Sequence, residues 1–226
     1  MANICTTTIY VEGKKESIEK LDKLFGDAEC NANNLNAIDS RNNWIGNLLL
    51  NRGIEPEQYD THRAFICDYG LDDNSTFYIL MESAWDDKMD AMNAVFYSVD
   101  ENLKPYYFAE ENGMEYFVSN DVENKYFGDY YVEGYADNYD LARKSGELER
   151  FRELIGETTF FTERELKVAL GKLLHDPFTK LDKLIEKIQT CEEYDPEDTG
   201  IYLGVHKIEK ITKLGRSIDG LSIRVL

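Results

Sequence analysis

The chain has 226 residues, of which 25 are Lys or Arg and 44 are Asp or Glu, so its formal net charge at pH 7 is −19. This charge argues against a protein that binds the phosphate backbone of nucleic acids, because that affinity comes mostly from clustered positive charge. Hydrophobic residues make up 42% of the chain and aromatic residues 12%, which is too much for a disordered acidic polymer and enough to bury one or two cores.

The first residues contain neither the basic stretch nor the apolar core of a signal peptide, and no later apolar run approaches the about 20 residues of a membrane span. We therefore expect a cytoplasmic protein without a membrane span. The cysteines lie tens of residues apart without a C-x-x-C pair. No zinc site or redox couple is indicated, and reduced, buried thiols are expected at Cys5, Cys30, Cys67 and Cys191.

The N-terminal part of the chain predicts one strand and two helices. β-Branched and aromatic residues over 6–11 favour a strand. In the helix that follows, Ser17 is the expected cap, Gly26 the expected end, and the apolar stripe consists of Ile18, Leu21, Leu24 and Phe25. Trp44 then anchors a short helix that Gly53 closes.

Residues 64–119 predict two hairpins separated by a helix. The strand-like runs 64–69 and 76–82 flank turn-forming residues and are expected to pair. Trp85 closes the second run, and carboxylates then complement the dipole of a following helix: Asp86, Asp87 and Asp90. The strands 106–110 and 114–119 are joined by Asn112-Gly113, which is typical of a tight primed turn with positive φ angles.

This order of strand, helix, two strands, helix and two further strands indicates the fold class. It is close to the split β-α-β arrangement called ferredoxin-like. We therefore expect an α+β fold in which an antiparallel sheet carries helices on one face, formed by residues 1–139. Residues 130–135 are a candidate for a further edge strand of that sheet.

From about Asp140 the pattern becomes helical. An apolar stripe runs over 148–155, a capping box of Thr162 and Glu165 begins a second helix, and Pro177 suits the first turn of a third. Strand-like runs at 201–205 and 221–225 end the chain. We therefore expect residues 140–226 to form a mostly helical extension that closes with a small β-hairpin.

Acidic and aromatic residues concentrate in the middle of the chain. Between Asp86 and Asp140 there are 14 acidic residues against three lysines, and 13 of the 28 aromatic residues lie between Phe96 and Tyr139. Adjacent rings in a strand point to opposite faces, so some of them meet solvent or a partner. Two interpretations stay open: a binding face of Tyr and carboxylate groups, or a solvated acidic face that only confers solubility.

Several segments resemble one protein family. They are the opening Met-Ala-Asn-Ile-Cys-Thr-Thr-Thr, Trp-Ile-Gly-Asn-Leu at 44–48, Glu-Ser-Ala-Trp at 82–85, and Glu-Glu-Asn-Gly-Met-Glu-Tyr-Phe-Val-Ser-Asn-Asp at 110–121 through Lys-Tyr-Phe at 125–127. Over roughly residues 1–135 the chain resembles the YubB-type (Api-like) ferredoxin-like proteins, which are carried largely on bacterial plasmids, prophages and conjugative elements. The resemblance implies a ferredoxin-like fold without an iron–sulfur cluster, and it transfers no catalytic residue. The fourth position of the opening motif is often Trp in this family and is Ile4 here.

The sequence contains no signature of cofactor or metal chemistry. It lacks both G-x-G-x-x-G and the P-loop lysine pattern, so nucleotide binding by those routes is not expected. Residues 195–200 mimic the first half of a calcium loop, but the twelfth position is His206 where a bidentate Glu is needed. The three histidines are widely separated, so we expect no metal, no cofactor and no assignable catalytic residue.

Two functional hypotheses follow from the middle of the chain. The leading one is a non-enzymatic interaction protein that engages a basic protein partner through its Tyr-rich acidic face, in a sharper form as a mimic of the DNA phosphate array. The alternative is an enzyme or binder that acts on a small molecule or carbohydrate with Glu82 and Glu111 as its carboxylates. The residues expected to bind are Glu82, Trp85, Glu110, Glu111, Tyr116, Tyr126 and Tyr130.

Overall fold

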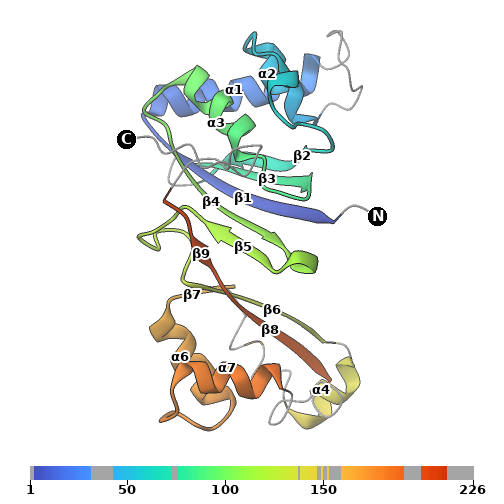
Figure 1. Cartoon of the computed structure of the whole chain (residues 1–226), viewed down its shortest axis with the longest axis vertical. Helices are drawn as coiled ribbons and strands as arrows, with labels where there is room; N and C mark the ends of the chain where they lie inside the picture. The colour runs from blue at the N-terminus through green and yellow to red at the C-terminus, as the bar shows by residue number, and fades with distance from the viewer. Residues whose placement is uncertain are drawn as a thin grey trace. The chain divides into compact units, whose positions relative to one another are not determined.

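The computed structural model describes residues 3–31, 43–72, 76–136, 138–146, 149, 152, 159–190 and 200–212. In these residues it is a mixed α+β structure with one six-stranded and one three-stranded sheet (Figure 1), which confirms the α+β class. The chain forms two compact units. Unit 1 comprises Met1–Val122 with Lys210–Leu226, and unit 2 comprises Glu123–Glu209. The sequence predicts a division after residue 139 instead.

The six-stranded sheet brings together strands from both ends of the chain. Its order is β2-β3-β1-β4-β5-β9. Neighbours from β2 to β5 pair antiparallel. The strands are β1 (Ile4–Glu12), β2 (Phe65–Leu71), β3 (Phe77–Ala84), β4 (Lys104–Glu111), β5 (Tyr116–Ser119) and β9 (Glu209–Lys210).

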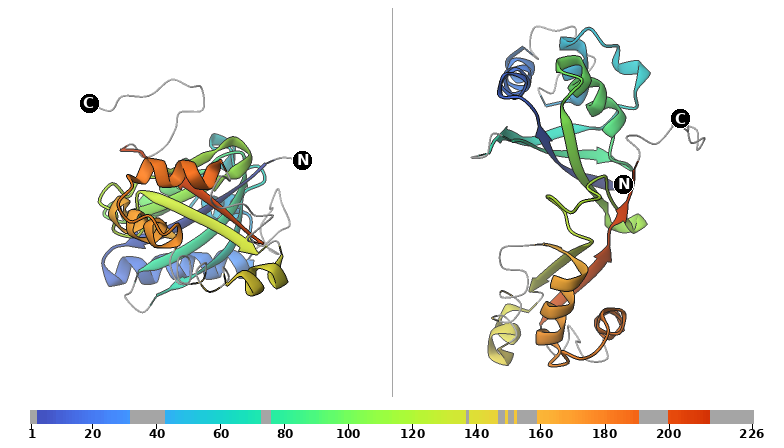
Figure 2. Two further views of the ribbon diagram at one scale, coloured as in Figure 1. Left: turned by 90° about the horizontal axis from the view of Figure 1, so that it is seen from below. Right: turned by 90° about the vertical axis from the view of Figure 1, so that its left-hand side faces the viewer.

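Three helices, α1 (Lys15–Asn31), α2 (Ile45–Asn51) and α3 (Met89–Val99), lie together on one face of this sheet (Figure 2). Every second residue of β1 points toward them, because side chains alternate between the faces of a strand. Those residues are fully buried: Cys5, Thr7, Ile9 and Val11. The same alternation sends Thr6 and Thr8 to the face without helices.

Two predicted helix signals act differently from what was expected. α1 begins at Lys15, so Ser17 lies inside its first turn and not at the cap, and its hydroxyl donates a hydrogen bond to the Asp100 carboxylate. Gly26 does not end the helix, which continues to Asn31. A glycine in a helix interior costs only about 1 kcal/mol, and Ala28 beyond it is buried in the core.

The hairpin between β4 and β5 also differs from its predicted turn. A short 3₁₀ segment, η2 (Asn112–Met114), replaces the two-residue primed turn, and the positive φ angle of 52° falls on Glu115. The Glu111 carboxylate accepts a hydrogen bond from the Gly113 N–H. This side-chain bond stabilises the connection, because it satisfies a backbone donor within the turn.

Unit 2 is built on a three-stranded sheet of order β7-β6-β8. Its strands are β6 (Tyr130–Ala136), β7 (Phe160–Phe161) and β8 (Ile201–Lys207). The prediction that 130–135 extend the first sheet is therefore wrong, because β6 pairs antiparallel with β7 and β8 instead. The predicted hairpin partner at 221–225 lies outside the described residues.

The helices of unit 2 are α4 (Tyr139–Ser145), α6 (Glu163–Leu173) and α7 (Leu181–Gln189). The capping box at the start of α6 is confirmed, with Thr162 and Glu165 each accepting a backbone N–H of the other residue. Pro177 lies in the turn before α7 rather than in its first turn. α6 and α7 bury their apolar stripes in the core of unit 2, through Leu166, Leu170, Leu173, Leu181, Leu184 and Ile188. The predicted stripe over 148–155 falls almost entirely outside the described residues.

None of the described helices has the length and hydropathy needed to cross a bilayer.

The Ser17–Asp100 contact predicts a pH-dependent stability. Hydrogen bonds from the Ser17 hydroxyl and from Asn102 lower the pKa of Asp100 from 3.8 to about 2. A carboxylate whose pKa is lower in the folded state stabilises above its unfolded pKa and loses that effect as the pH falls through the folded value. We expect the melting temperature of the protein to fall between pH 4 and pH 2, and to fall less steeply in Asp100→Asn, as measured by thermal unfolding across that range. Parallel curves for the two proteins would contradict this assignment.

Candidate functional site

Five of the seven residues proposed from the sequence lie at one end of the six-stranded sheet, all within unit 1. Strand pairing brings them together: Ile4 at the start of β1 lies opposite Ala84 at the end of β3, and Thr6 lies opposite Glu110 on β4. Glu111 in turn lies opposite Tyr116 on β5. We call this region the acidic end; it consists of Glu82, Trp85, Asp86, Asp87, Asp90, Glu110, Glu111 and Tyr116.

The most unusual residue of the acidic end is Trp85, directly after β3. Its φ angle is +74°, a region that bulky side chains rarely adopt, and its side chain is 51% exposed. The backbone N–H of Trp85 donates a hydrogen bond of 3.2 Å to the Asn3 carbonyl oxygen. A residue in this conformation costs about 1–3 kcal/mol and persists only where the surrounding structure holds it. This exposure also means that the Trp85 side chain is not buried in the core of unit 1.

Lys88 stabilises the turn that contains Trp85. Its side chain is almost fully buried, and its ammonium group lies 2.7 Å from Asp60 Oδ2 and 2.9 Å from Asp86 Oδ1. Burial by itself lowers the pKa of this lysine, but its hydrogen bonds to Asp60 and Asp86 outweigh burial and raise it. Lys88 is thus a structural cation that holds two acidic side chains in place.

The carboxylates at the start of α3 are held by neighbours on other elements. Asp87 accepts a hydrogen bond of 2.8 Å from the Tyr116 hydroxyl and one of 3.0 Å from the Met89 N–H. Burial raises the pKa of Asp90, and the charges of Asp87 and Asp86 raise it further. The sequence placed these carboxylates in the first helical turn, but α3 begins at Met89, so two of them precede it.

The two carboxylates proposed as an acid–base pair are not brought together. Glu82 and Glu110 both lie opposite Thr6 and therefore share the face of the sheet without helices. Glu111 follows Glu110 in the strand and points to the other face, where it is 5% exposed. The pair that shares a face is Glu82 with Glu110.

Two tyrosines of the same face were missed by the sequence analysis. Tyr10 of β1 lies opposite Tyr78 of β3, and their ring centroids are 5.5 Å apart. The signal was the alternation in residues 76–82, where the residues at 78, 80 and 82 point away from the buried Phe77, Ile79 and Met81. The face without helices therefore carries aromatic rings as well as the carboxylates of Glu82 and Glu110.

Tyr126 and Tyr130 belong to unit 2 and are not part of the acidic end. Tyr130 is 6% exposed and packs in the core of unit 2, so its proposed role in an exposed binding face is wrong. The Lys125 ammonium lies 5.6 Å from the centroid of the Tyr126 ring. This distance is typical of a cation–π contact, so the chain itself supplies a cation to that ring.

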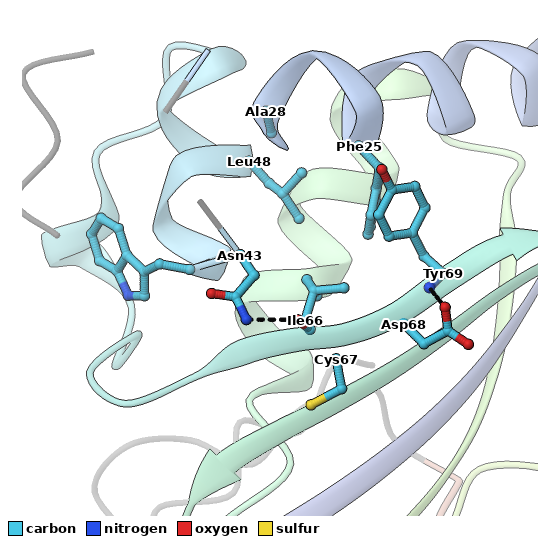
Figure 3. Close-up of a pocket in the computed structure, with 9 residues that line it drawn as sticks. Phe25, Ala28, Asn43, Leu48, Ile66, Cys67, Asp68 and Tyr69 are labelled. Atoms are coloured by element: carbon cyan, nitrogen blue, oxygen red, sulfur yellow. Dashed lines mark hydrogen bonds between the residues drawn. The ribbon is translucent and has the colours of Figure 1, made fainter. Parts of the chain in front are cut away.

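A hollow of about 640 Å³ opens at the edge strand β2 (Figure 3). Phe25, Ala28 and Leu48 reach it from the helices, and Ile66 and Tyr69 from the strand. These side chains also border the core of unit 1, and the hollow contains neither Glu82 nor Glu111. Cys67 at its rim is exposed, with its thiol pKa raised mainly by desolvation. The hollow therefore does not support the predicted acid–base pair.

Among the described residues, no group of three or more His, Cys, Asp or Glu side chains is arranged to hold a metal ion.

No protein-family model, curated protein or solved structure matches the chain. The resemblance to the YubB-type proteins therefore stays a prediction.

Proposed function

We propose that the protein is a non-enzymatic binding module that engages a basic segment of a partner protein at the acidic end. The observation that carries the proposal is Trp85, a large aromatic side chain held half-exposed in a strained conformation. Exposed Trp rings attract Lys and Arg side chains through cation–π contacts worth about 0.5–1 kcal/mol each. Residues in strained backbone conformations are also concentrated at binding sites.

The charge around Trp85 supports the same class of partner. Asp86 follows it in the chain, and Glu82 precedes it on an exposed position of β3. Between Thr76 and Asp121 there are ten acidic residues against two lysines, and one of these, Lys88, is already bonded to Asp60 and Asp86. A basic segment would thus meet an aromatic ring and a surplus of carboxylates.

The proposal extends to the fold family and to the setting. The central order β2-β3-β1-β4 with antiparallel pairing supports a ferredoxin-like arrangement, in which the first and third strands lie in the middle. The motifs shared with YubB-type proteins support a cytoplasmic role linked to bacterial mobile elements. In its sharper form the acidic end imitates a DNA phosphate array and occupies the DNA-binding surface of the partner, which makes binding strongly dependent on salt.

A peptide titration tests the proposal. The probe is a labelled Lys- and Arg-rich octapeptide, with a Glu-rich octapeptide as its counterpart, and the readout is fluorescence anisotropy at low and high salt. We expect Trp85→Gly and Glu82→Lys each to weaken binding about tenfold. Trp85→Gly should also raise the free energy of unfolding by about 1 kcal/mol, because glycine adopts a positive φ angle without strain.

The matched control is Asp27→Lys, which makes the same charge change as Glu82→Lys at an exposed position of α1. It should change the affinity by less than twofold. Equal losses in Asp27→Lys and Glu82→Lys would mean that only the overall charge attracts the peptide, and the proposed site would be wrong.

A further inference from the structure

A buried carboxylate oxygen of the acidic end lacks a hydrogen-bond donor. Glu111 is 5% exposed, and its two oxygens differ in their surroundings. Oε1 accepts a hydrogen bond of 3.1 Å from the Gly113 N–H, whereas Oε2 is buried and has no hydrogen-bond partner among the described residues. Buried polar atoms are nearly always paired in hydrogen bonds. Burying an unpaired carboxylate oxygen costs more free energy than burying an unpaired neutral oxygen. We therefore expect a hydrogen-bond donor from another molecule at this oxygen.

Other negative charges lie close to this oxygen. Glu111 is paired in register with Tyr116, and the Tyr116 hydroxyl donates to Asp87. Burial raises the pKa of the nearby Cys5 thiol to about 12, and the charges of Asp87, Asp86 and Glu111 contribute to the rise against a hydrogen bond from Thr7 that lowers it. The negative charges of Asp86, Asp87 and Glu111 therefore all act on Cys5, at the start of β1.

The turn that follows Glu111 is exposed, and the Asn3 side chain lies beside it. Residues 112–115, which include η2, are all exposed. An added Cβ atom at Gly113 would lie 3.0 Å from Glu111 Oε1 and 3.1 Å from Asn3 Nδ2, so the glycine leaves space beside the carboxylate that a side chain would fill.

We infer that the acidic end receives the ammonium group of a lysine side chain from the basic segment, and that this ammonium donates to Glu111 Oε2. The inference rests on the proposed function and names the partner's residue type. Lysine fits better than arginine because Glu111 Oε1 is already occupied by the Gly113 N–H. The parallel two-oxygen pairing that favours guanidinium is not available, whereas an ammonium is a compact point charge that needs one acceptor.

The test compares three peptides of equal length: Ac-(Lys-Ser)₄-NH₂, Ac-(Arg-Ser)₄-NH₂ and the lysine peptide with every lysine acetylated. The unmodified protein should bind the lysine peptide about fivefold more tightly than the arginine peptide, and should not bind the acetylated one. Glu111→Gln keeps an acceptor for the Gly113 N–H but removes the charge. It should weaken lysine-peptide binding about tenfold and bring the ratio of the two affinities close to one.

Trp85→Gly serves as the matched comparison, because it should weaken both peptides while leaving their ratio unchanged. A ratio near one in the unmodified protein, or a ratio that Glu111→Gln leaves unchanged, would overturn the inference and assign Oε2 to a buried water. In that case loss of both peptides in Glu82→Lys would still uphold the proposed function. Absence of binding to either basic peptide would remove both proposals. The comparison in the unmodified protein needs no variant, so it stands even if Glu111→Gln folds poorly.

Discussion

Replacing Trp44 with alanine is expected to lower the free energy of unfolding by about 4 kcal/mol. The Trp44 ring is 5% exposed, its Nε1–H donates a hydrogen bond of 2.8 Å to the Thr61 carbonyl oxygen, and its backbone pairs with Phe65. Removing the ring opens a large cavity beside α2 and leaves the Thr61 carbonyl without its donor. Urea denaturation followed by circular dichroism measures the loss.

Two further variants separate the packing of Trp44 from its hydrogen bond. Trp44→Phe keeps most of the apolar volume and loses the N–H, so it should cost about 1–2 kcal/mol. Gly46→Ala should also destabilise, because an added Cβ would lie 2.2 Å from the Trp44 ring. A Trp44→Ala protein that unfolds at the same urea concentration as the unmodified one would show that α2 is anchored in another way.

Replacing Gly128 with alanine is expected to cost about 3 kcal/mol in unit 2. An added Cβ would lie 2.3 Å from the Phe161 carbonyl oxygen and 2.7 Å from the Phe161 nitrogen, which are backbone atoms of β7. The neighbouring Asp129 N–H also donates to the Phe161 oxygen at 2.8 Å. Because backbone atoms cannot rotate away as a side chain does, the alanine must displace β7 from β6.

Amide hydrogen exchange shows which strands lose stability in Gly128→Ala. Amides of β6 and β7 should exchange faster in Gly128→Ala, while those of β1 and β3 should keep their rates because these two strands belong to the other compact unit. Gly26→Ala is the control. Gly26 lies in a helix interior, and an added Cβ there would meet no described atom within 4 Å apart from the adjacent backbone of α1, so this change should stabilise by about 1 kcal/mol. Unchanged exchange in β6 and β7 would contradict the packing of β7 against Gly128.

The sequence predicted local elements well where the signal was local. Strand composition over 64–69 and 76–82, with turn-forming residues between them, predicted the hairpin that β2 and β3 form, and the Thr162–Glu165 capping box marked the start of α6. Both depend on residues close together in the chain. Element ends were less reliable, as at Gly26, because burial of Ala28 beyond it extends α1.

The candidate site was predicted in part. Glu82, Trp85, Glu110, Glu111 and Tyr116 do gather at one end of the sheet, because each lies at or next to the end of a strand and β1 pairs with both β3 and β4. Tyr130 was misassigned, because its strand pairs with residues 201–207, about seventy positions away. No local pattern distinguishes that partner from the nearer first sheet.

Composition, period and capping residues alone determined that this protein is acidic, that it is α+β, and where most of its helices and strands begin. Only the tertiary structure decided that the chain divides between two sheets, that Glu82 and Glu111 face opposite sides, and that one oxygen of Glu111 is buried without a donor. The reason is physical. Local signals report the free energy of a segment by itself, whereas strand partners and burial depend on contacts between segments far apart in the chain.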